Sequence, residues 1–277
     1  MAQFTTKVFG SAGAAIDRDK SFDGFLVHEL DPAVRVRVVR AMPDLDAALD
    51  GAVEALWRAA AARVAAGGAG TLFNGRVFSA DVISAGEITG HVTEFRRIVA
   101  QMEQPGLFGA LRLRPLAVCG VLRCADGVPF GRRHPAAIYQ PGMWQLPPAG
   151  SVDARAIEAD GAVDLCAQVL SELTEELGIS ADQVARPRPL CVVEHPGSHV
   201  SDVGLALVTG LTGAEVLEAH RTRANEEYAC LRVVPFVGLA EFVGGVGELL
   251  VPPARVFLVR AGLLPSAHGP WHQFGMV

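Results

Sequence analysis

The chain has 277 residues, of which 50% are hydrophobic and 19% charged, and its formal net charge is −6. This length suffices for one sizeable core and a second small domain. The acidic balance argues against charge-driven binding of nucleic acid, and no uncharged apolar stretch reaches the ~18 residues that a membrane span requires.

The cysteines and the first residues of the chain indicate a compartment. Five cysteines form neither a Cys-x-x-Cys pair nor a cluster with histidines: Cys119, Cys124, Cys166, Cys191 and Cys230. This spacing is typical of reduced, packed thiols and argues against a zinc site. The N-terminus leads into charged residues rather than into the apolar segment of a signal peptide. We therefore expect a cytoplasmic protein.

The first part of the chain, residues 1–110, is predicted to form an α+β extension. Its strongest signal is a helix at 44–66, where apolar residues recur at steps of three and four between Asp44 and Gly67. The other expected elements are a strand at 33–39, strand-like segments from 71 to about 88 and a helix at 93–102.

The second part, residues 111–277, is predicted to form the main domain. Asp126-Gly127 indicates a tight hairpin turn that returns the strand at 115–123 as a paired strand at 128–132. The later elements are strands at 190–194 and 203–208, a helix at 214–220, a strand at 228–233 and a helix at 253–263.

The most informative segment lies before Gly178. Glu172, Glu175 and Glu176 stand at i, i+3 and i+4, so a helix places all three carboxylates on one face. Like charges packed in this way repel one another, and a bound cation would reverse that cost. Hard oxygen ligands suit Mg²⁺ or Mn²⁺. The alternative is a solvated helix face, which Glu-rich patterns often form.

The surroundings of the three glutamates favour a site. Leu173, Leu177 and Ile179 are apolar, which indicates that the helix lies against a core, and Gly178 suits the end of a helix. Asp164 is a suitable N-cap. Upstream, residues 144–150 (W-Q-L-P-P-A-G) indicate a short strand that ends in a tight loop.

Residues 172–179 (E-L-T-E-E-L-G-I) resemble the second half of the Nudix box, G-x5-E-x7-R-E-U-x-E-E-x-G-U, where U is aliphatic. The resemblance implies a Nudix-type α/β/α sandwich with a mixed sheet, with Glu172, Glu175 and Glu176 as metal ligands and catalytic groups. Two features depart from the family. Ser171 stands where the family has an arginine that orients a box glutamate. Gly150 as the loop glycine implies an insertion of about seven residues, and 151–161 reads as a polar excursion.

The resemblance also implies a function. Nudix enzymes use Mg²⁺ to cleave a diphosphate linked to another moiety, usually in a nucleoside diphosphate derivative. The water's proton needs an acceptor, and the candidates besides the box glutamates are Glu226, Glu227 and Asp202. The first two could equally form a solvated turn. We assign substrate contacts to a further set: Arg133, Trp144, Gly150, His195 and His199.

A weaker resemblance concerns the substrate. Residues 72–75 (L-F-N-G) with Phe78, and the later Gly131-Arg132-Arg133, are similar to the UDP-glucose (nucleotide-sugar) pyrophosphatase branch of the family. This implies a nucleotide sugar as substrate. Many Nudix enzymes pair through added N-terminal strands, so the family resemblance also implies a homodimer, with residues 1–110 in contact with the substrate or the second subunit. Asn74-Gly75 by itself indicates only a turn.

Three interpretations follow from these patterns. The first is a Mg²⁺-dependent hydrolase of the nucleotide-linked diphosphate. The second is a catalytically weak or silent Nudix-fold module that binds nucleotides or regulates, motivated by Ser171 and the long loop. The third is a surface helix on an unrelated α/β fold. The intact set of glutamates favours the first.

Overall fold

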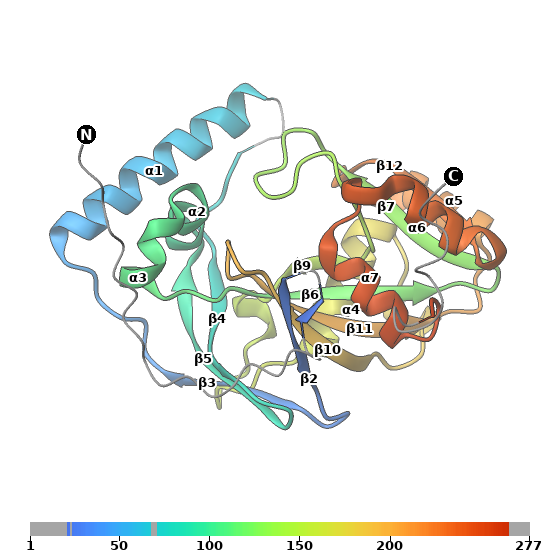
Figure 1. The fold of residues 1–277 in the computed structure, drawn as a ribbon, viewed down its shortest axis with the longest axis horizontal. Coiled ribbons are helices and arrows are strands. Elements are labelled where there is room, and N and C mark those ends of the chain that lie inside the picture. Colours follow the sequence, from blue (N-terminus) through green and yellow to red (C-terminus); the bar gives the residue numbers. More distant parts are fainter. Residues whose placement is uncertain (1–20, 23, 68–70, 266–277) are drawn as a thin grey trace, which may run out of the picture.

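The computed structural model describes residues 21–22, 24–67 and 71–265. The first residues of the chain, on which the expectation about a signal peptide rests, lie outside the described residues. The centre is a six-stranded sheet (Figure 1). Its strands run in the order β1 (Ser21–Phe22), β2 (Phe25–Glu29), β10 (Arg188–Glu194), β11 (Ser201–Val208), β6 (Leu116–Arg123) and β9 (Ala149–Ser151). β6 pairs with β11 in parallel, and the other pairs are antiparallel. The predicted α/β class with a mixed sheet is confirmed.

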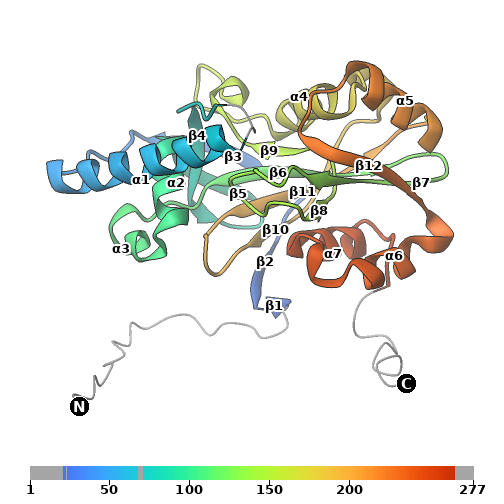
Figure 2. The same cartoon turned by 90° about the horizontal axis from the view of Figure 1, so that it is seen from above.

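Helices cover both faces of this sheet (Figure 2). α4 (Leu165–Leu177) and α5 (Gly213–Arg223) lie on one face, and α6 (Leu239–Val246) and α7 (Pro252–Arg260) lie on the other. The strands alternate accordingly, because successive side chains point to opposite faces. In β6, Val118 and Leu122 join the cluster under α4, whereas Cys119 and Val121 join the cluster under α7.

A second sheet has three antiparallel strands in the order β12 (Tyr228–Pro235), β7 (Gly127–Arg133) and β8 (Trp144–Gln145). The tight turn before β7 exists, since Cys124 N–H donates to the carbonyl of Gly127 at 2.9 Å. The predicted pairing of the two flanking strands is wrong, because β7 leaves β6 and pairs with β12 and β8. Gly127 allows this crossing, since a Cβ there would overlap the carbonyl of Val234.

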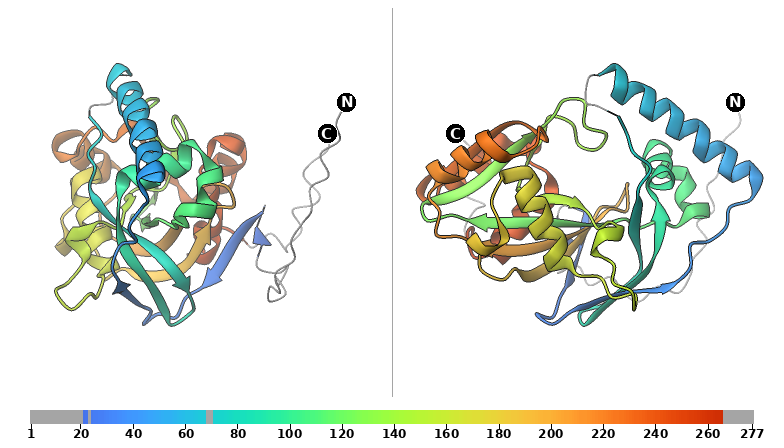
Figure 3. Two further views of the ribbon diagram at one scale, coloured as in Figure 1. Left: turned by 90° about the vertical axis from the view of Figure 1, so that its left-hand side faces the viewer. Right: turned by 180° about the vertical axis from the view of Figure 1, so that it is seen from behind.

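The N-terminal region adds a three-stranded sheet in the order β3 (Arg35–Arg40), β5 (Glu87–Glu94) and β4 (Arg76–Ile83). Its helices are α1 (Ala47–Ala66), α2 (Phe95–Glu103) and α3 (Phe108–Leu111), and Figure 3 shows α1 along the outer side. Short 3₁₀ segments complete the described elements: Pro105–Leu107, Ala154–Ala156, Ala181–Gln183, Phe236–Gly238 and Gly247–Leu249.

Among the described residues, no helix is both long enough and apolar enough to cross a membrane.

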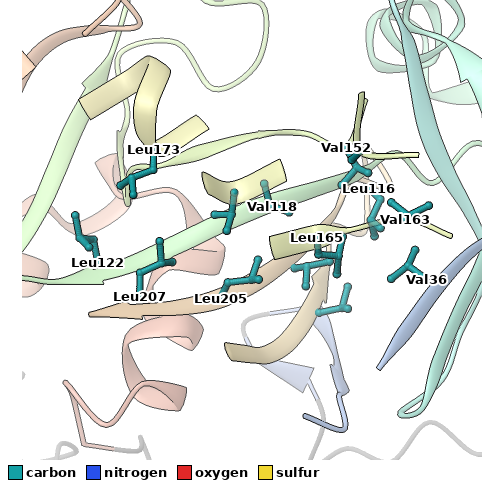
Figure 4. Close-up of a cluster of buried hydrophobic side chains, with 14 of the residues drawn as sticks. Val36, Leu116, Val118, Leu122, Val152, Val163, Leu165, Leu173, Leu205 and Leu207 are labelled. Carbon is teal, nitrogen blue, oxygen red and sulfur yellow. The ribbon is translucent and has the colours of Figure 1, made fainter. Parts of the chain in front are cut away.

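The N-terminal sheet shares a core with the central sheet. Val36 packs in the same buried cluster as Leu116, Val163 and Leu165 (Figure 4). β2, which also precedes residue 110, pairs with β10 of the central sheet. The division into 1–110 and 111–277 stays a prediction.

The segment predicted to be a polar excursion, residues 151–161, is tied into this shared core. Val152 and Ala156 are buried. The N–H of Phe78 donates to the carbonyl of Val152 at 2.8 Å, and the N–H of Val38 donates to the carbonyl of Gly161 at 2.8 Å. The prediction of a polar excursion is therefore correct only in part, because Val152 and Ala156 pack inward whereas Arg155, Glu158 and Asp160 are exposed.

Candidate active site

The predicted boundaries of the glutamate helix are confirmed. α4 begins after Asp164, whose carboxylate accepts a hydrogen bond from the N–H of Ala167 at 2.9 Å. It ends at Gly178, whose φ of 65° is left-handed and favours glycine. Leu173 and Leu177 are fully buried against the sheet, and the glutamates lie on an adjoining face of the helix.

All three glutamates line one cleft of about 730 Å³. Its walls come from both parts of the chain: α2, β4, β6, β9, α4 and the loop after β7. The apolar lining includes Phe73, Val77, Phe95, Ile98 and Met102 from the N-terminal region. The cleft therefore joins an acidic end, formed by α4, to an apolar end, formed by residues before 110.

Glu176 is the most deeply placed of the three, with 2% of its surface exposed. The Tyr228 hydroxyl donates to its Oε2 at 2.6 Å, and the N–H of Ala149 donates to the same oxygen at 3.1 Å. Burial raises the pKa of Glu176 well above its ordinary value, and the negative charge of Glu172 adds to this effect. The interpretation of the triplet as a solvated face is wrong for this residue.

Glu172 is held from two sides. The Gln168 side-chain amide donates to its Oε1 at 2.7 Å. A Cβ at Gly150 would overlap the Glu172 carboxylate, so a larger residue there would require this carboxylate to move. Burial raises the pKa of Glu172 to about 7, and the negative charge of Glu175 contributes.

Glu175 is the exposed member of the set. Its Oε1 accepts a hydrogen bond from the hydroxyl of Ser171 at 3.1 Å and another from Nη1 of Arg155 at 2.9 Å. Each glutamate is thus turned toward its own donors. Among the residues that the structure describes, no three potential ligands are gathered closely enough to enclose a metal ion as they stand.

The predicted bases outside the helix differ in position. Glu227 and Asp202 line the cleft, whereas Glu226 is exposed and is not part of the lining. Oε1 of Glu227 lies 3.6 Å from Nη2 of Arg133. Oδ2 of Asp202 lies 2.8 Å from Nε2 of His195.

The guanidinium of Arg133, predicted to bind substrate, lies at the cleft but is engaged with the protein. Its Nη1 donates to Oε1 of Gln145 at 2.6 Å, and its Nε donates to the carbonyl of Tyr139 at 3.0 Å. Gln145 in turn donates to the Tyr228 hydroxyl at 2.7 Å. A chain of hydrogen bonds therefore runs from Arg133 to Glu176.

Of the other predicted substrate residues, the structure brings Gly150 to the cleft but not Trp144, His195 or His199. Trp144 packs edge-to-face on Phe242, at a centroid distance of 5.6 Å. His195 lies behind Asp202, with its Nδ1 2.9 Å from the Tyr139 hydroxyl.

His199 stacks on Phe108 at a centroid distance of 3.5 Å. Its Nδ1 lies 3.5 Å from Oε1 of Glu194. This places His199 in a contact between the loop after β10 and the N-terminal region, outside the lining of the cleft that holds the three glutamates of α4.

Sequence reasoning missed three side chains that contact the glutamates, Tyr228, Gln168 and Arg155, and Gln145, which donates to Tyr228. Gln168 had a usable signal, because it stands four residues before Glu172 on the same helix face. The other three reach the site only through tertiary folding.

Comparison with known proteins gives distant structural likenesses only. No protein-family model matches the chain, and no curated protein matches it. A MutT protein from Methanosarcina mazei is 20% identical over 53% of this chain and 92% of its own, with a TM-score of 0.38. A Nudix hydrolase from M. smegmatis is 20% identical over 55% and 89%, with a TM-score of 0.36. An Ap4A hydrolase from C. elegans is 13% identical over 53% and 99%, with a TM-score of 0.35. With TM-scores below 0.5, these likenesses do not by themselves assign the chain to a family.

Proposed function

We propose that this protein is a Nudix hydrolase that cleaves the diphosphate bond of a nucleoside diphosphate linked to another moiety, with Mg²⁺ or Mn²⁺ as cofactor. The observation that carries the proposal is the position of Glu172, Glu175 and Glu176 on one helix face that lines a cleft. Burial of Glu176 in that face adds support, since an ordinary surface carboxylate is not buried.

The donor set suits a divalent cation of this kind. Three carboxylates offer hard oxygen ligands. Burial raises the pKa of both Glu172 and Glu176, because it disfavours the charged form of a carboxyl, and a bound cation would favour that form. Glu172, Glu175 and Glu176 would hold the ion. When bound, it would neutralise phosphate oxygens and activate a water molecule.

The protein's own groups would orient the substrate and take up the proton. Asp202 and Glu227 line the same cleft as the glutamates, so either can accept a proton from a water there. Asp202 is kept in place by His195, and Glu227 by Arg133. Tyr228 and the N–H of Ala149 keep the Glu176 carboxylate in a fixed orientation.

We further propose a nucleotide sugar as the substrate, which rests on the resemblance of residues 72–78 to one branch of the family. The apolar end of the cleft supports an additional bulky moiety beyond the diphosphate, because Phe73, Phe95 and Ile98 line it. We also propose a homodimer, by analogy with the Nudix family, and a cytoplasmic location, which rests on the spacing of the five cysteines. The N-terminal region would then contribute to substrate binding.

The test is turnover of a nucleotide panel with Mg²⁺ or Mn²⁺: UDP-glucose, GDP-mannose, ADP-ribose, NADH, diadenosine polyphosphates and nucleoside triphosphates. Ion-exchange chromatography would resolve the products. We expect one substrate class to release a nucleoside monophosphate, and Glu176→Gln to lower that rate by about 100-fold or more. Glu218→Gln, on the exposed side of α5, is the matched control. Nucleotide binding without turnover would support the silent module instead.

A further inference from the structure

The segment between β9 and α4 does more than connect them. A short 3₁₀ helix, Ala154–Ala156, begins after Asp153, whose Oδ1 accepts a hydrogen bond from the N–H of Arg155 at 2.7 Å. Buried Val152 and Ala156 fix this turn to the core on either side of the exposed Arg155. The backbone that carries Arg155 is thus anchored, although its side chain reaches outside.

The planar guanidinium of Arg155 contacts two carboxylates, those of Asp153 and Glu175. Its Nε donates to Oδ2 of Asp153 at 2.9 Å, its Nη2 lies 2.8 Å from the same oxygen, and its Nη1 donates to Oε1 of Glu175 at 2.9 Å. The planar fork of an arginine makes such double contacts with less loss of freedom than a lysine would. Asp153 therefore fixes the guanidinium, which in turn fixes Glu175.

Both donors to Glu175 use the same oxygen. Ser171, one turn earlier on α4, donates to Oε1 at 3.1 Å, and Arg155 donates to that atom as well. The second carboxylate oxygen, Oε2, has no hydrogen bond to any described side chain or backbone group. This arrangement leaves one oxygen of Glu175 for the cleft while the other oxygen determines the rotamer.

The same segment reaches a second glutamate. The N–H of Asp153 donates to Oε1 of Gln168 at 3.3 Å, and Nε2 of Gln168 donates to Oε1 of Glu172 at 2.7 Å. Glu172 and Glu175 are therefore both oriented from residues 153–155, one through a glutamine and the other through an arginine.

We propose that Arg155 is a positioning residue for the Glu175 carboxylate. Residues 151–161 would then supply, from outside the helix, the positively charged side chain that position 171 lacks. The proposal rests on the function proposed above, since it concerns how Glu175 meets a divalent cation. An arginine at 171 would stand at i relative to Glu175 at i+4, within reach of the same carboxylate. The chain has placed the positive charge on a neighbouring loop instead.

The test measures Mn²⁺ affinity by electron paramagnetic resonance of the free ion, together with turnover of the substrate found in the panel. Arg155→Ala should weaken Mn²⁺ binding and slow turnover by about tenfold or more, as expected for a group that orients a ligand. Adding Ser171→Arg to Arg155→Ala should restore most of both. Arg155→Lys keeps the charge without the fork and should restore less.

The direction in which Arg155→Ala changes the Mn²⁺ affinity shows whether Arg155 orients Glu175 or only repels the metal ion by its charge. If Arg155 acted only by its charge, its removal would make Mn²⁺ bind more tightly; unchanged or tighter binding in Arg155→Ala would overturn the proposal. An exposed ion pair adds little to stability, so the melting temperature should stay close to that of the wild type. Glu158→Gln, exposed on the same segment, is the control. A wild type that binds no Mn²⁺ and turns over nothing would instead overturn the proposed function.

Discussion

The hydroxyl of Tyr228 donates a 2.6 Å hydrogen bond to Oε2 of Glu176, and 52 positions separate these two residues in the chain. Both side chains are buried. The contact links the first strand position of β12 to the helix α4, and so attaches the smaller sheet to the acidic end of the cleft. Three predictions concern this contact and the residues of the cleft, and a fourth concerns the stability of the fold at acidic pH.

Tyr228→Phe should weaken both the site and the fold. The change leaves the buried Glu176 carboxylate with the N–H of Ala149 as its donor, and leaves Nε2 of Gln145 without its acceptor. We expect a loss of about 1–3 kcal/mol in the free energy of unfolding and slower turnover. Urea unfolding and steady-state kinetics would measure these effects. Cys230→Ser, exposed on the same strand, should change neither.

Gly150→Ala should displace Glu172. A Cβ at this position would overlap the carboxylate of Glu172, whereas a Cβ at Gly197 would meet nothing within 4 Å. The carboxylate is the far end of a flexible side chain, so it can shift at little cost in stability, and its displacement should slow turnover. Gly197→Ala is the matched control and should behave as wild type. Equal activity of the two variants would mean that Glu172 can move without loss.

Glu227→Gln should lower turnover more than Glu226→Gln. The two residues are neighbours, but Glu227 lines the cleft and Glu226 is exposed. A group that takes up a proton contributes about 100-fold or more to the rate. If Glu227→Gln keeps the wild-type rate, Asp202→Asn becomes the next variant to measure, because Asp202 lines the cleft too. Circular dichroism would establish that each variant is folded.

Stability at acidic pH should depend on Glu194. Burial raises the pKa of this carboxyl, but the hydrogen bond from His28 and the charge of Arg114 outweigh it, so the pKa lies below the ordinary 4.5. A carboxyl with a lowered pKa stabilises the fold above its unfolded-state pKa, and this contribution is lost as the pH falls through the lower folded value.

Urea unfolding at a series of pH values from neutral to acidic would measure this effect. Glu194→Gln should be less stable than wild type at pH 7, and the difference should shrink below pH 4.5. Glu248→Gln, which is exposed, should show no such pH dependence. A constant difference between wild type and Glu194→Gln would contradict the prediction.

The local pattern of the glutamate helix could be predicted because it depends on near neighbours. Asp164 as the N-cap and Gly178 as the terminator act within one turn of the helix, and the i, i+3, i+4 spacing places the three carboxylates on one face whatever surrounds them. The strands and helices of the main domain were found for the same reason. An exception is α6 (Leu239–Val246), whose glycines, Gly244 and Gly245, weaken its helical signal.

The amino-acid sequence thus determined the α/β class, the acidic helix and the chemistry that its carboxylates can perform. Only the tertiary structure decided which residues hold those carboxylates. Tyr228 reaches Glu176 because β12 pairs with β7, and Arg155 reaches Glu175 because Val152 and Ala156 anchor its segment in the core. Contacts of this kind join residues far apart in the chain, so no local pattern encodes them, and the packing of whole elements brings them together.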